Sequence, residues 1–219
     1  MSEVKTIAIL GGTGKEGPGL AMRWANAGYK IIIGSRQQEK AEATAAELNE
    51  TLGIDSIIGL ENEVAAQQAD VNVLTVVQSA HQPALEGLKA ELQGKILVDA
   101  TARVDFRDPK PPEAPSAGRI AQDILGEGVR VVAAFQNVPA SALKKNLDQP
   151  VTGTDVLVCA DDVEAAEMVV KLAGDAGMRA FYGGGLDNAL VVEGLTALLI
   201  SMNKHYGGHS SINVSGIEK

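Results

Sequence analysis

The chain has 219 residues, of which 45% are hydrophobic and 3% are aromatic, so its core must consist mainly of aliphatic side chains. Its formal net charge of −9 argues against nucleic acid or an anionic membrane surface as the main partner, because both require a basic footprint. The single cysteine, Cys159, excludes an intrachain disulfide and a cysteine zinc cluster.

No targeting or membrane segment is evident in the sequence. The first apolar run, residues 6–10, is too short for the core of a signal peptide. No stretch approaches the roughly 18 apolar residues that a membrane-spanning helix needs. We therefore expect a cytoplasmic protein with no membrane partner.

Apolar runs alternate with amphipathic patterns through the first half of the chain. The expected strands are 6–10, 29–34, 56–60, 71–77 and 95–100, and the expected helices are 15–27, 37–53, 61–69 and 80–93. In the first helix, Leu20, Trp24 and Ala27 share one face, and Gly28 ends it. Strands that are apolar on both faces predict a parallel sheet covered by helices, joined by right-handed crossovers.

The second half begins with an interruption at residues 103–118, where four prolines and mixed charges predict a loop or lid. A helix at 119–125, strands at 129–135, 154–160 and 178–182, and a helix at 162–174 are expected next. The last helix, 186–206, is apolar around much of its circumference. Either a second copy of the chain or an intrachain core would cover it. The predicted fold class is α/β, a Rossmann-type doubly wound parallel sheet with a smaller C-terminal α/β part.

The segment GGTGKEG, residues 11–17, follows the first strand and precedes the first helix. Gly12, Gly14 and Gly17 form the pattern G-x-G-x-x-G in the context that this motif requires. The first glycine permits a tight turn, the second lets the backbone approach a pyrophosphate, and the third lets helix and strand pack closely. Thr13 adds a hydroxyl donor. The motif predicts dinucleotide binding, and a glycine-rich turn without a ligand is the alternative.

The end of the second strand distinguishes NADP from NAD. An NAD site has an acidic residue there that accepts from the ribose 2′-hydroxyl, but this chain has Ser35 and Arg36, with Lys40 one helical turn later. A guanidinium fork, an ammonium and a hydroxyl suit a 2′-phosphate, which a carboxylate would repel. NADP is therefore the predicted cofactor. The alternative is that these cations pair with Glu39 or Glu42 at the surface.

The sequence shows no metal site and no evident acid–base apparatus. His81, His205 and His209 have no metal-ligand spacing, and neither a G-x-S-x-G elbow nor a Tyr-x-x-x-Lys pair occurs. His81 lies either at the rim of the site or in solvent at the start of a helix. Hydride transfer between two carriers needs little such apparatus, because the protein has mainly to align two rings and exclude water.

Several segments carry a resemblance to a known family. GGTGKEGPGLAMRWANAGYKIIIGSRQQEKAE, GRIAQDILGEGVRVVAAFQNVPA and LDNALVVEGLTALLISMNKHYG resemble the NADPH-dependent coenzyme F420 reductases, also called reduced coenzyme F420:NADP oxidoreductases. The resemblance implies an oxidoreductase that transfers a hydride between NADP(H) and C5 of the deazaflavin coenzyme F420. It also implies a homodimer, an NADP-binding Rossmann domain at 1–135, and a C-terminal part at 136–219 that completes the electron-partner site and the dimer interface.

The resemblance also assigns positions in this chain to the cofactor. Thr13, Gly14, Lys15 and Glu16 match the pyrophosphate loop; Ser35, Arg36 and Lys40 match the 2′-phosphate site; Val76 and Ala80 lie near the ribose and nicotinamide; Ala102 and Ala140 match further cofactor contacts. Arg103, Arg107, Lys144 and Lys145 either meet the anionic tail of coenzyme F420 or are ordinary surface charges.

The departures from the family pattern fall on the side of the electron partner. Gln136 stands where the family often has His, and Val77-Gln78 stands where it often has Pro-Trp. Gln136 is a candidate for orienting the acceptor ring, or else a structural residue at a strand end. The second carrier is thus open to alternatives: a flavin, a small imine or carbonyl substrate, or no substrate at all in a non-catalytic NADP-binding module.

Overall fold

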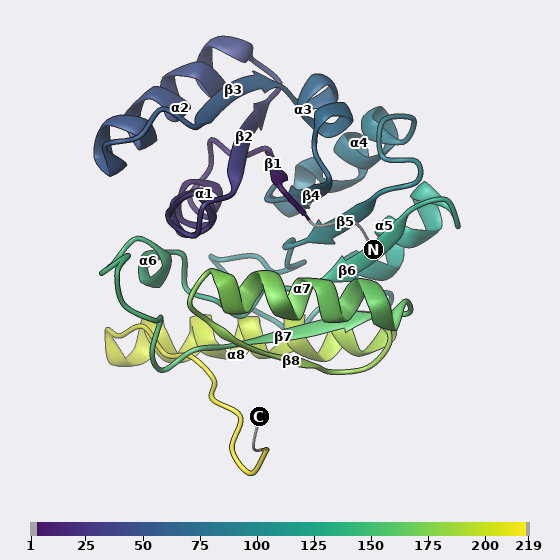
Figure 1. The fold of residues 1–219 in the computed structure, drawn as a ribbon. Helices are drawn as coiled ribbons and strands as arrows, with labels where there is room; N and C mark the ends of the chain where they lie inside the picture. Colours follow the sequence, from purple (N-terminus) through teal and green to yellow (C-terminus); the bar gives the residue numbers. More distant parts are fainter. Residues whose placement is uncertain (1–3, 218–219) are drawn as a thin grey trace.

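The computed structural model describes residues 4–217, and within them the chain forms one eight-stranded sheet (Figure 1). The strand order is β3-β2-β1-β4-β5-β6-β7-β8. The strands are β1 (Thr6–Leu10), β2 (Lys30–Ser35), β3 (Ile57–Glu61), β4 (Val71–Leu74), β5 (Ile96–Asp99), β6 (Arg130–Ala133), β7 (Asp155–Ala160) and β8 (Arg179–Tyr182). The first six strands have the order and parallel direction of a Rossmann sheet.

Helices cover both faces of this sheet, as the predicted doubly wound fold requires. They are α1 (Gly17–Asn26), α2 (Gln38–Leu52), α3 (Asn62–Gln68), α4 (Gln78–Leu88), α5 (Ala117–Leu125), α6 (Ala140–Leu143), α7 (Val163–Asp175) and α8 (Ala189–Tyr206). One core joins α1, α2 and α7 to one face, and a second core joins α3, α4, α5 and α8 to the other. Alternate residues of β1 divide between the cores, with Ile7 and Ile9 in the first and Ala8 and Leu10 in the second.

One step in the sheet corrects the prediction of a wholly parallel arrangement. Strand β7 pairs antiparallel with β6, through Val132 with Ala160 and Ala133 with Cys159, and β8 is then parallel to β7. A parallel crossover usually needs a helix long enough to traverse the sheet. Residues 134–154 contain only the single turn of α6, so the chain reverses instead and this connection stays at the carboxyl edge of β6.

The first helix also differs from its predicted course. Helix α1 begins at Gly17 rather than residue 15, and Ala27 is exposed, not part of the buried face. The helix ends one residue earlier than expected, so Ala27 falls at the C-cap and Gly28 takes the positive φ of 93° that ends it. Trp24 is buried as predicted, and its Nε1 donates to the carbonyl of Leu172 in α7 at 2.8 Å.

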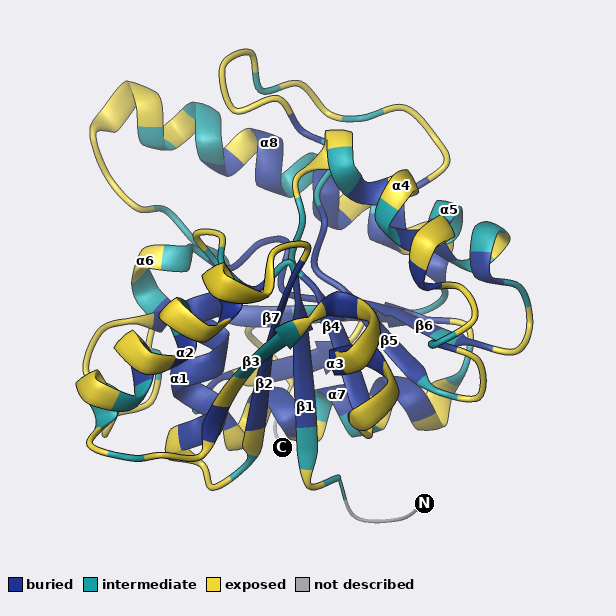
Figure 2. Cartoon of the chain, turned by 90° about the horizontal axis from the view of Figure 1, so that it is seen from above, coloured by how far each residue is buried: buried dark blue, intermediate teal, exposed yellow. Residues whose placement is uncertain are grey.

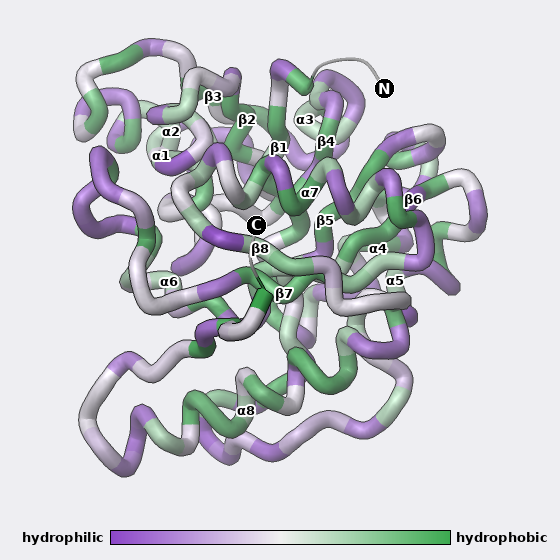
Figure 3. Tube along the Cα trace, turned by 60° about the horizontal axis from the view of Figure 1, so that its bottom comes forward, coloured by the Kyte–Doolittle hydropathy of each residue, from purple (hydrophilic) through white to green (hydrophobic). Residues whose placement is uncertain are grey.

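The predicted loop at 103–118 is a loop as far as Ser116, where α5 begins one residue later. Helix α8 is buried on one side only, since Val191, Leu198, Met202 and Tyr206 are exposed. Figure 2 shows both buried and exposed residues along α8, and Figure 3 shows that much of this helix is hydrophobic. The chain's own core thus covers one side of α8, and the other side is left for a second copy of the chain. The division at residue 135 stays a prediction, and the terminal residues 1–3 and 218–219 of the predicted domains lie outside the described part of the chain.

Candidate active site

The carboxyl ends of neighbouring strands align at one edge of the sheet. Leu10 pairs with Leu74, Leu74 with Asp99, and Asp99 with Ala133, so these four residues form one row across β1, β4, β5 and β6. The glycine loop, Val76, Ala102 and Gln136 follow these strand ends. Parallel α/β sheets usually bind ligands at the carboxyl ends of their strands, and the predicted site residues are gathered at that edge.

The three motif glycines differ in what surrounds them. A Cβ added to Gly12 would lie 2.5 Å from the carbonyl oxygen of Ile9, and one added to Gly17 would lie 2.5 Å from that of Gly12. Both positions thus require glycine for the fold itself. At Gly14 the nearest atom would be 3.7 Å away, which is ordinary contact, and this residue is exposed. The space above Gly14 is left open by the folded chain, and it suits a pyrophosphate that must approach the backbone.

The remaining loop residues surround this open space. Thr13 is half-buried and Lys15 is exposed, so both can reach a ligand at the surface. The Oε1 of Glu16 is buried and has no hydrogen-bond partner in the described part of the chain. Burial raises the pKa of Glu16 to about 8, so this carboxyl is largely neutral at pH 7 and does not repel a phosphate there.

Asn62 supports the glycine loop and was missed by sequence reasoning. Its Oδ1 accepts from the backbone N–H of Gly11 at 3.1 Å, and the residue is buried in the first turn of α3. A Cβ at Gly34 would lie 2.7 Å from the same oxygen. Asn62 therefore fixes the start of the loop against the end of β2. Asn is common at the start of a helix, so nothing in the sequence marked this residue as a support of the glycine loop.

The end of β2 presents two cations. The Oγ of Ser35 accepts from the backbone N–H of Gln37 at 3.2 Å, which orders the turn. Arg36 and Lys40 are exposed, and neither forms an ion pair within residues 4–217. The alternative that Glu39 or Glu42 neutralises them thus finds no support in the structure. Two exposed cations that form no ion pair among residues 4–217 have the chemistry that the 2′-phosphate of NADP requires.

Four small or aliphatic residues assigned to the cofactor are all half-buried at this edge: Val76, Ala80, Ala102 and Ala140. Val76 packs on the glycine loop, since a Cβ added to Gly11 would lie 2.6 Å from its Cγ1. Ala140 begins α6, whose Leu143 lies against Gly19 of α1. The reversal after β6 therefore brings Ala140 back beside α1, the helix that follows the glycine loop.

A buried ion pair lies behind these residues and corrects the solvated alternative for His81. His81 is 4% exposed, and its Nε2 lies 2.7 Å from Oδ2 of Asp99, which is fully buried. Burial lowers the pKa of His81, but the hydrogen bond and charge of Asp99 outweigh it, and the net pKa is raised. Oδ1 of Asp99 accepts from the backbone N–H of Thr101 at 3.0 Å. The pair thereby orders the turn that leads to Ala102.

Gln136 combines features of both predicted roles. Its Nε2 donates to the carbonyl of Asp99 at 2.9 Å, which joins the ends of β5 and β6. Its Oε1 is buried and has no hydrogen-bond partner in the part of the chain that the structure describes. The side chain is thus held by one end and retains an acceptor at the other. Its role toward an acceptor ring remains a prediction.

The four cations considered for an anionic tail are not equivalent. The Arg103 guanidinium donates to the carbonyls of Glu113 and Pro115, so it holds the loop together. Arg107, Lys144 and Lys145 are exposed. Lys144 and Lys145 follow α6 at the carboxyl edge, which makes them better placed for an anion beside the site.

Other chemistry receives no support within the described residues. Among residues 4–217, no three His, Cys, Asp or Glu side chains gather as a metal site would require, and no helix has the length and apolarity to span a membrane. Burial raises the pKa of Cys159 to about 11, so it remains a thiol at neutral pH.

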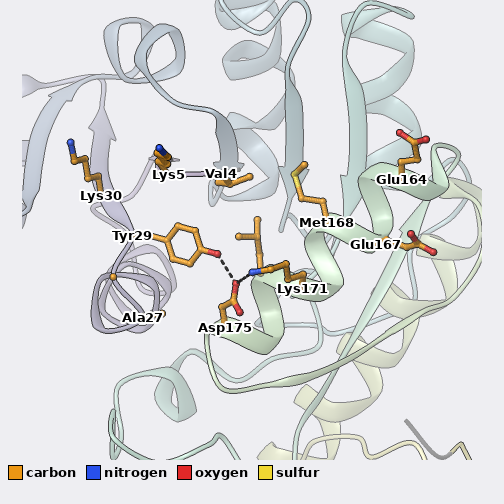
Figure 4. Close-up of a pocket in the computed structure, with 12 residues that line it drawn as sticks. Val4, Lys5, Ala27, Tyr29, Lys30, Glu164, Glu167, Met168, Lys171 and Asp175 are labelled. Carbon is orange, nitrogen blue, oxygen red and sulfur yellow. Dashed lines mark hydrogen bonds and ion pairs between the residues drawn. The ribbon is translucent and has the colours of Figure 1, made fainter. Parts of the chain in front are cut away.

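A groove of about 1190 Å³ lies at the opposite, amino edge of the sheet, where Tyr29 and Lys171 both bind Asp175 (Figure 4).

Comparison with known proteins identifies the family. Residues 6–103 match the family model described as NADP oxidoreductase coenzyme F420-dependent. An F420-dependent NADP reductase of Methanocaldococcus jannaschii is 43% identical over 225 residues, which cover 97% of this chain and 99% of that protein. The chain belongs to the F420-dependent NADP reductase family. Another member, from Methanothermobacter thermautotrophicus, is 41% identical over 210 residues, which cover 91% of this chain and 90% of that protein.

The similarity to the F420-dependent NADP reductases extends through the C-terminal part, well beyond residue 103. The resemblance that the glycine loop and the later segments indicated is thereby confirmed. A crystal structure of a protein from Arthrobacter sp. fb24 superimposes with a TM-score of 0.79 at 23% identity, covering 97% of this chain and 100% of that one. This structural likeness supports the fold alone.

Proposed function

We propose that this protein is an NADPH-dependent coenzyme F420 reductase, which transfers a hydride reversibly between NADP(H) and F420. Membership of the family supports the reaction. The observation that carries it is the open space above Gly14 in a loop bonded through Gly12 to Gly34 of β2, together with Arg36 and Lys40 after that strand, which form no ion pair among residues 4–217. A pyrophosphate and a 2′-phosphate, separated by one ribose, require this combination of backbone amides and cations.

Each part of the edge has a task in this reaction. The glycine loop and the N-terminus of α1 bind the pyrophosphate, and Arg36 and Lys40 bind the 2′-phosphate. Val76 and Ala80 line the ribose and nicotinamide, and Ala102 and Ala140 complete the cofactor contacts. These four side chains are apolar and exclude water. When both carriers are bound, they supply the chemistry itself, a hydride passing between the nicotinamide and C5 of the deazaflavin.

Gln136 orients the acceptor in this proposal. One hydrogen of its Nε2 is used by the carbonyl of Asp99, and the second hydrogen and Oε1 remain available to a ring that carries both donors and acceptors. Replacement of the family's frequent His by this neutral amide removes a charge but keeps the capacity to hydrogen-bond.

The decisive experiment mixes the protein with NADPH and F420 and follows the visible absorbance of the deazaflavin. Loss of that absorbance at a rate proportional to protein concentration is expected. Reduction of FMN but not F420 would instead support a flavin reductase. Tight NADPH binding without turnover of either acceptor would support a non-catalytic binding module.

We further infer that two copies associate through the exposed side of α8. The resemblance to the family implies a homodimer, and Val191, Leu198, Met202 and Tyr206 are 65%, 56%, 40% and 78% exposed along this helix. Burying such apolar surface against its own copy is favourable. Sedimentation equilibrium should give twice the chain mass, and Leu198→Glu should reduce it to one chain mass. A monomeric wild-type protein would contradict this proposal.

A further inference from the structure

Glu193 is a fully buried carboxylate whose task lies outside the nucleotide contacts described above. It is on α8 and is 0% exposed. Its Oε2 accepts from the backbone N–H of Arg103 at 3.0 Å, and its Oε1 accepts from that of Ala117 at 2.7 Å. Arg103 opens the proline-rich loop and Ala117 begins α5, directly after the loop ends. One side chain therefore fastens both ends of the loop 103–116.

The rest of the loop is anchored to the same helix or to itself. Nζ of Lys204, near the end of α8, donates to the carbonyl of Arg107 at 2.8 Å. Pro111 lies near Gly194, where an added Cβ would be 3.7 Å from its Cβ. The Arg103 guanidinium donates to the carbonyls of Glu113 and Pro115 from across the loop. The loop is thus an arch along α8 whose base is closed by Glu193.

An ionised carboxylate in this position is unfavourable for stability by itself. Burying this charge costs more free energy than burying an apolar side chain of similar volume. The hydrogen bonds from two amide donors offset only part of that cost. Burial, with the charge of Asp99, raises the pKa of Glu193, while the two backbone donors and Arg103 act in the opposite direction. What a carboxylate provides here, and an amide or alkyl group does not, is two acceptors aimed at two separate backbone N–H groups.

The segment that Glu193 fixes leads directly to the proposed site. Ala102 immediately precedes Arg103, and the preceding Thr101 is bound by Asp99 of the His81 pair. One turn later on the buried side of α8, Oγ1 of Thr196 donates to the carbonyl of Gln136 at 2.9 Å. Helix α8 consequently holds two strand-end segments at once, the one that carries Ala102 and the one that carries Gln136.

We propose that Glu193 is a positioning residue for hydride transfer: by binding the backbone at both ends of the loop 103–116, it fixes the placement of Ala102 against the bound carriers. Glu193 itself touches neither carrier. This inference rests on the proposed function for its catalytic consequence, whereas the clamping of the loop can be measured without any substrate.

The test compares Glu193→Gln with wild type and with Glu167→Gln, which removes one exposed carboxylate from α7. In Glu193→Gln one amide group replaces one acceptor, so one of the two backbone N–H groups loses its partner. Hydrogen exchange at whichever of Arg103 and Ala117 loses its acceptor, and tryptic cleavage after the exposed Arg107, should each accelerate roughly tenfold, the effect of losing one charge-assisted hydrogen bond. Glu167→Gln should match wild type in both.

Kinetics then separate positioning from a merely structural role. In Glu193→Gln the kcat should fall roughly tenfold or more while the KM for NADPH stays within about twofold, because the phosphates are bound elsewhere. Unchanged exchange and cleavage would overturn the clamp, and a looser loop with unchanged kcat would overturn the positioning role. A wild-type protein that does not reduce F420 would instead overturn the proposed function, while the exchange result would still stand.

A second variant guards against failure to fold. Glu193→Asp keeps the charge and shortens the side chain by one methylene, so it should lengthen both hydrogen bonds and accelerate exchange at both amides, each by less than the roughly tenfold expected where Glu193→Gln removes an acceptor. If Glu193→Gln does not fold, faster exchange at both Arg103 and Ala117 in Glu193→Asp supports the clamp, and wild-type rates at both overturn it.

Discussion

At the scale of single residues, Arg36 should determine the preference for NADP over NAD. Its guanidinium is exposed and lacks an ionic partner among residues 4–217, so the whole effect of replacing it should appear in ligand binding. We expect Arg36→Glu to weaken the binding of NADPH by about a hundredfold, equivalent to about 3 kcal/mol, and the binding of NADH by much less. Calorimetric titration measures both, with Lys89→Glu on the exposed end of α4 as the matched charge reversal. Equal weakening of the two ligands would contradict the 2′-phosphate role.

Glu16 makes the same binding site sensitive to pH. Its pKa in the folded protein is raised from 4.5 to about 8, so the carboxyl gains its charge only as the pH rises through about 8. A new negative charge in the phosphate loop should then repel the pyrophosphate. We expect the Kd for NADPH to rise between about pH 7 and pH 9, and Glu16→Gln to abolish that rise. A Kd that varies equally in both proteins would show that another group titrates.

The residues that sequence reasoning identified are those defined by local spacing. Gly12, Gly14 and Gly17 occupy fixed positions between a strand and a helix, and Arg36 follows the next strand, so pattern alone locates them. Asn62, Asp99 and Glu193 act on partners that are 51, 18 and 90 residues away in sequence. Nothing local distinguishes them from ordinary polar residues, and only the packed structure reveals those contacts.

At the scale of elements, the connection 143–149 depends on Arg23 of α1. This arginine is 4% exposed, and its guanidinium donates to the backbone carbonyls of Leu143 at 2.9 Å and Gln149 at 2.8 Å, and also to that of Lys145. Burial lowers the pKa of Arg23, but a guanidinium stays charged at any pH in ordinary use. One side chain thereby replaces the secondary structure that this connection lacks.

Replacing Arg23 should accordingly destabilise the fold. Arg23→Lys keeps the charge but loses the planar fork, and we expect it to lower the free energy of unfolding by about 2–4 kcal/mol. Asn26→Ala, which removes one exposed hydrogen bond to the carbonyl of Leu147, should lower it by less than about 1 kcal/mol. Urea unfolding measures both, and equal losses would argue against a special role for the guanidinium.

The spacing of apolar residues predicts most of the helices and strands. Where an element departs from that prediction, the cause is local. The apolar run 71–77 continues past the end of β4 because Val76 leaves the ladder to pack on Gly11. Helix α6 has a single turn, too short for a periodic signal. The reversed direction of β7 could have been inferred, since residues 136–153 offer no helix long enough for a parallel crossover.

At the scale of the whole molecule, the buried pair of His81 and Asp99 links stability to pH. The folded pKa of His81 is raised above 6.5, with Asp99 and Glu193 favouring its charged form and burial and Arg103 opposing it. Its contribution is therefore fully present below about pH 6.5 and is lost as the pH rises through the folded pKa. The free energy of unfolding of the wild-type protein should therefore decrease as the pH rises above about 6.5. That of His81→Asn should decrease less. Parallel curves for the two proteins would contradict this linkage.

The antiparallel step between β6 and β7 has an evolutionary consequence. Residues 134–154 do not cross a face of the sheet, but Phe135, Val138 and Leu143 are buried in its core, so within this connection only exposed positions such as Lys144, Lys145 and Asp148 are free to change. Substitutions at those exposed positions should change which anionic acceptor the protein prefers, while Arg36 and Lys40, which we propose to select the nucleotide, follow β2 in a separate segment and would be inherited intact.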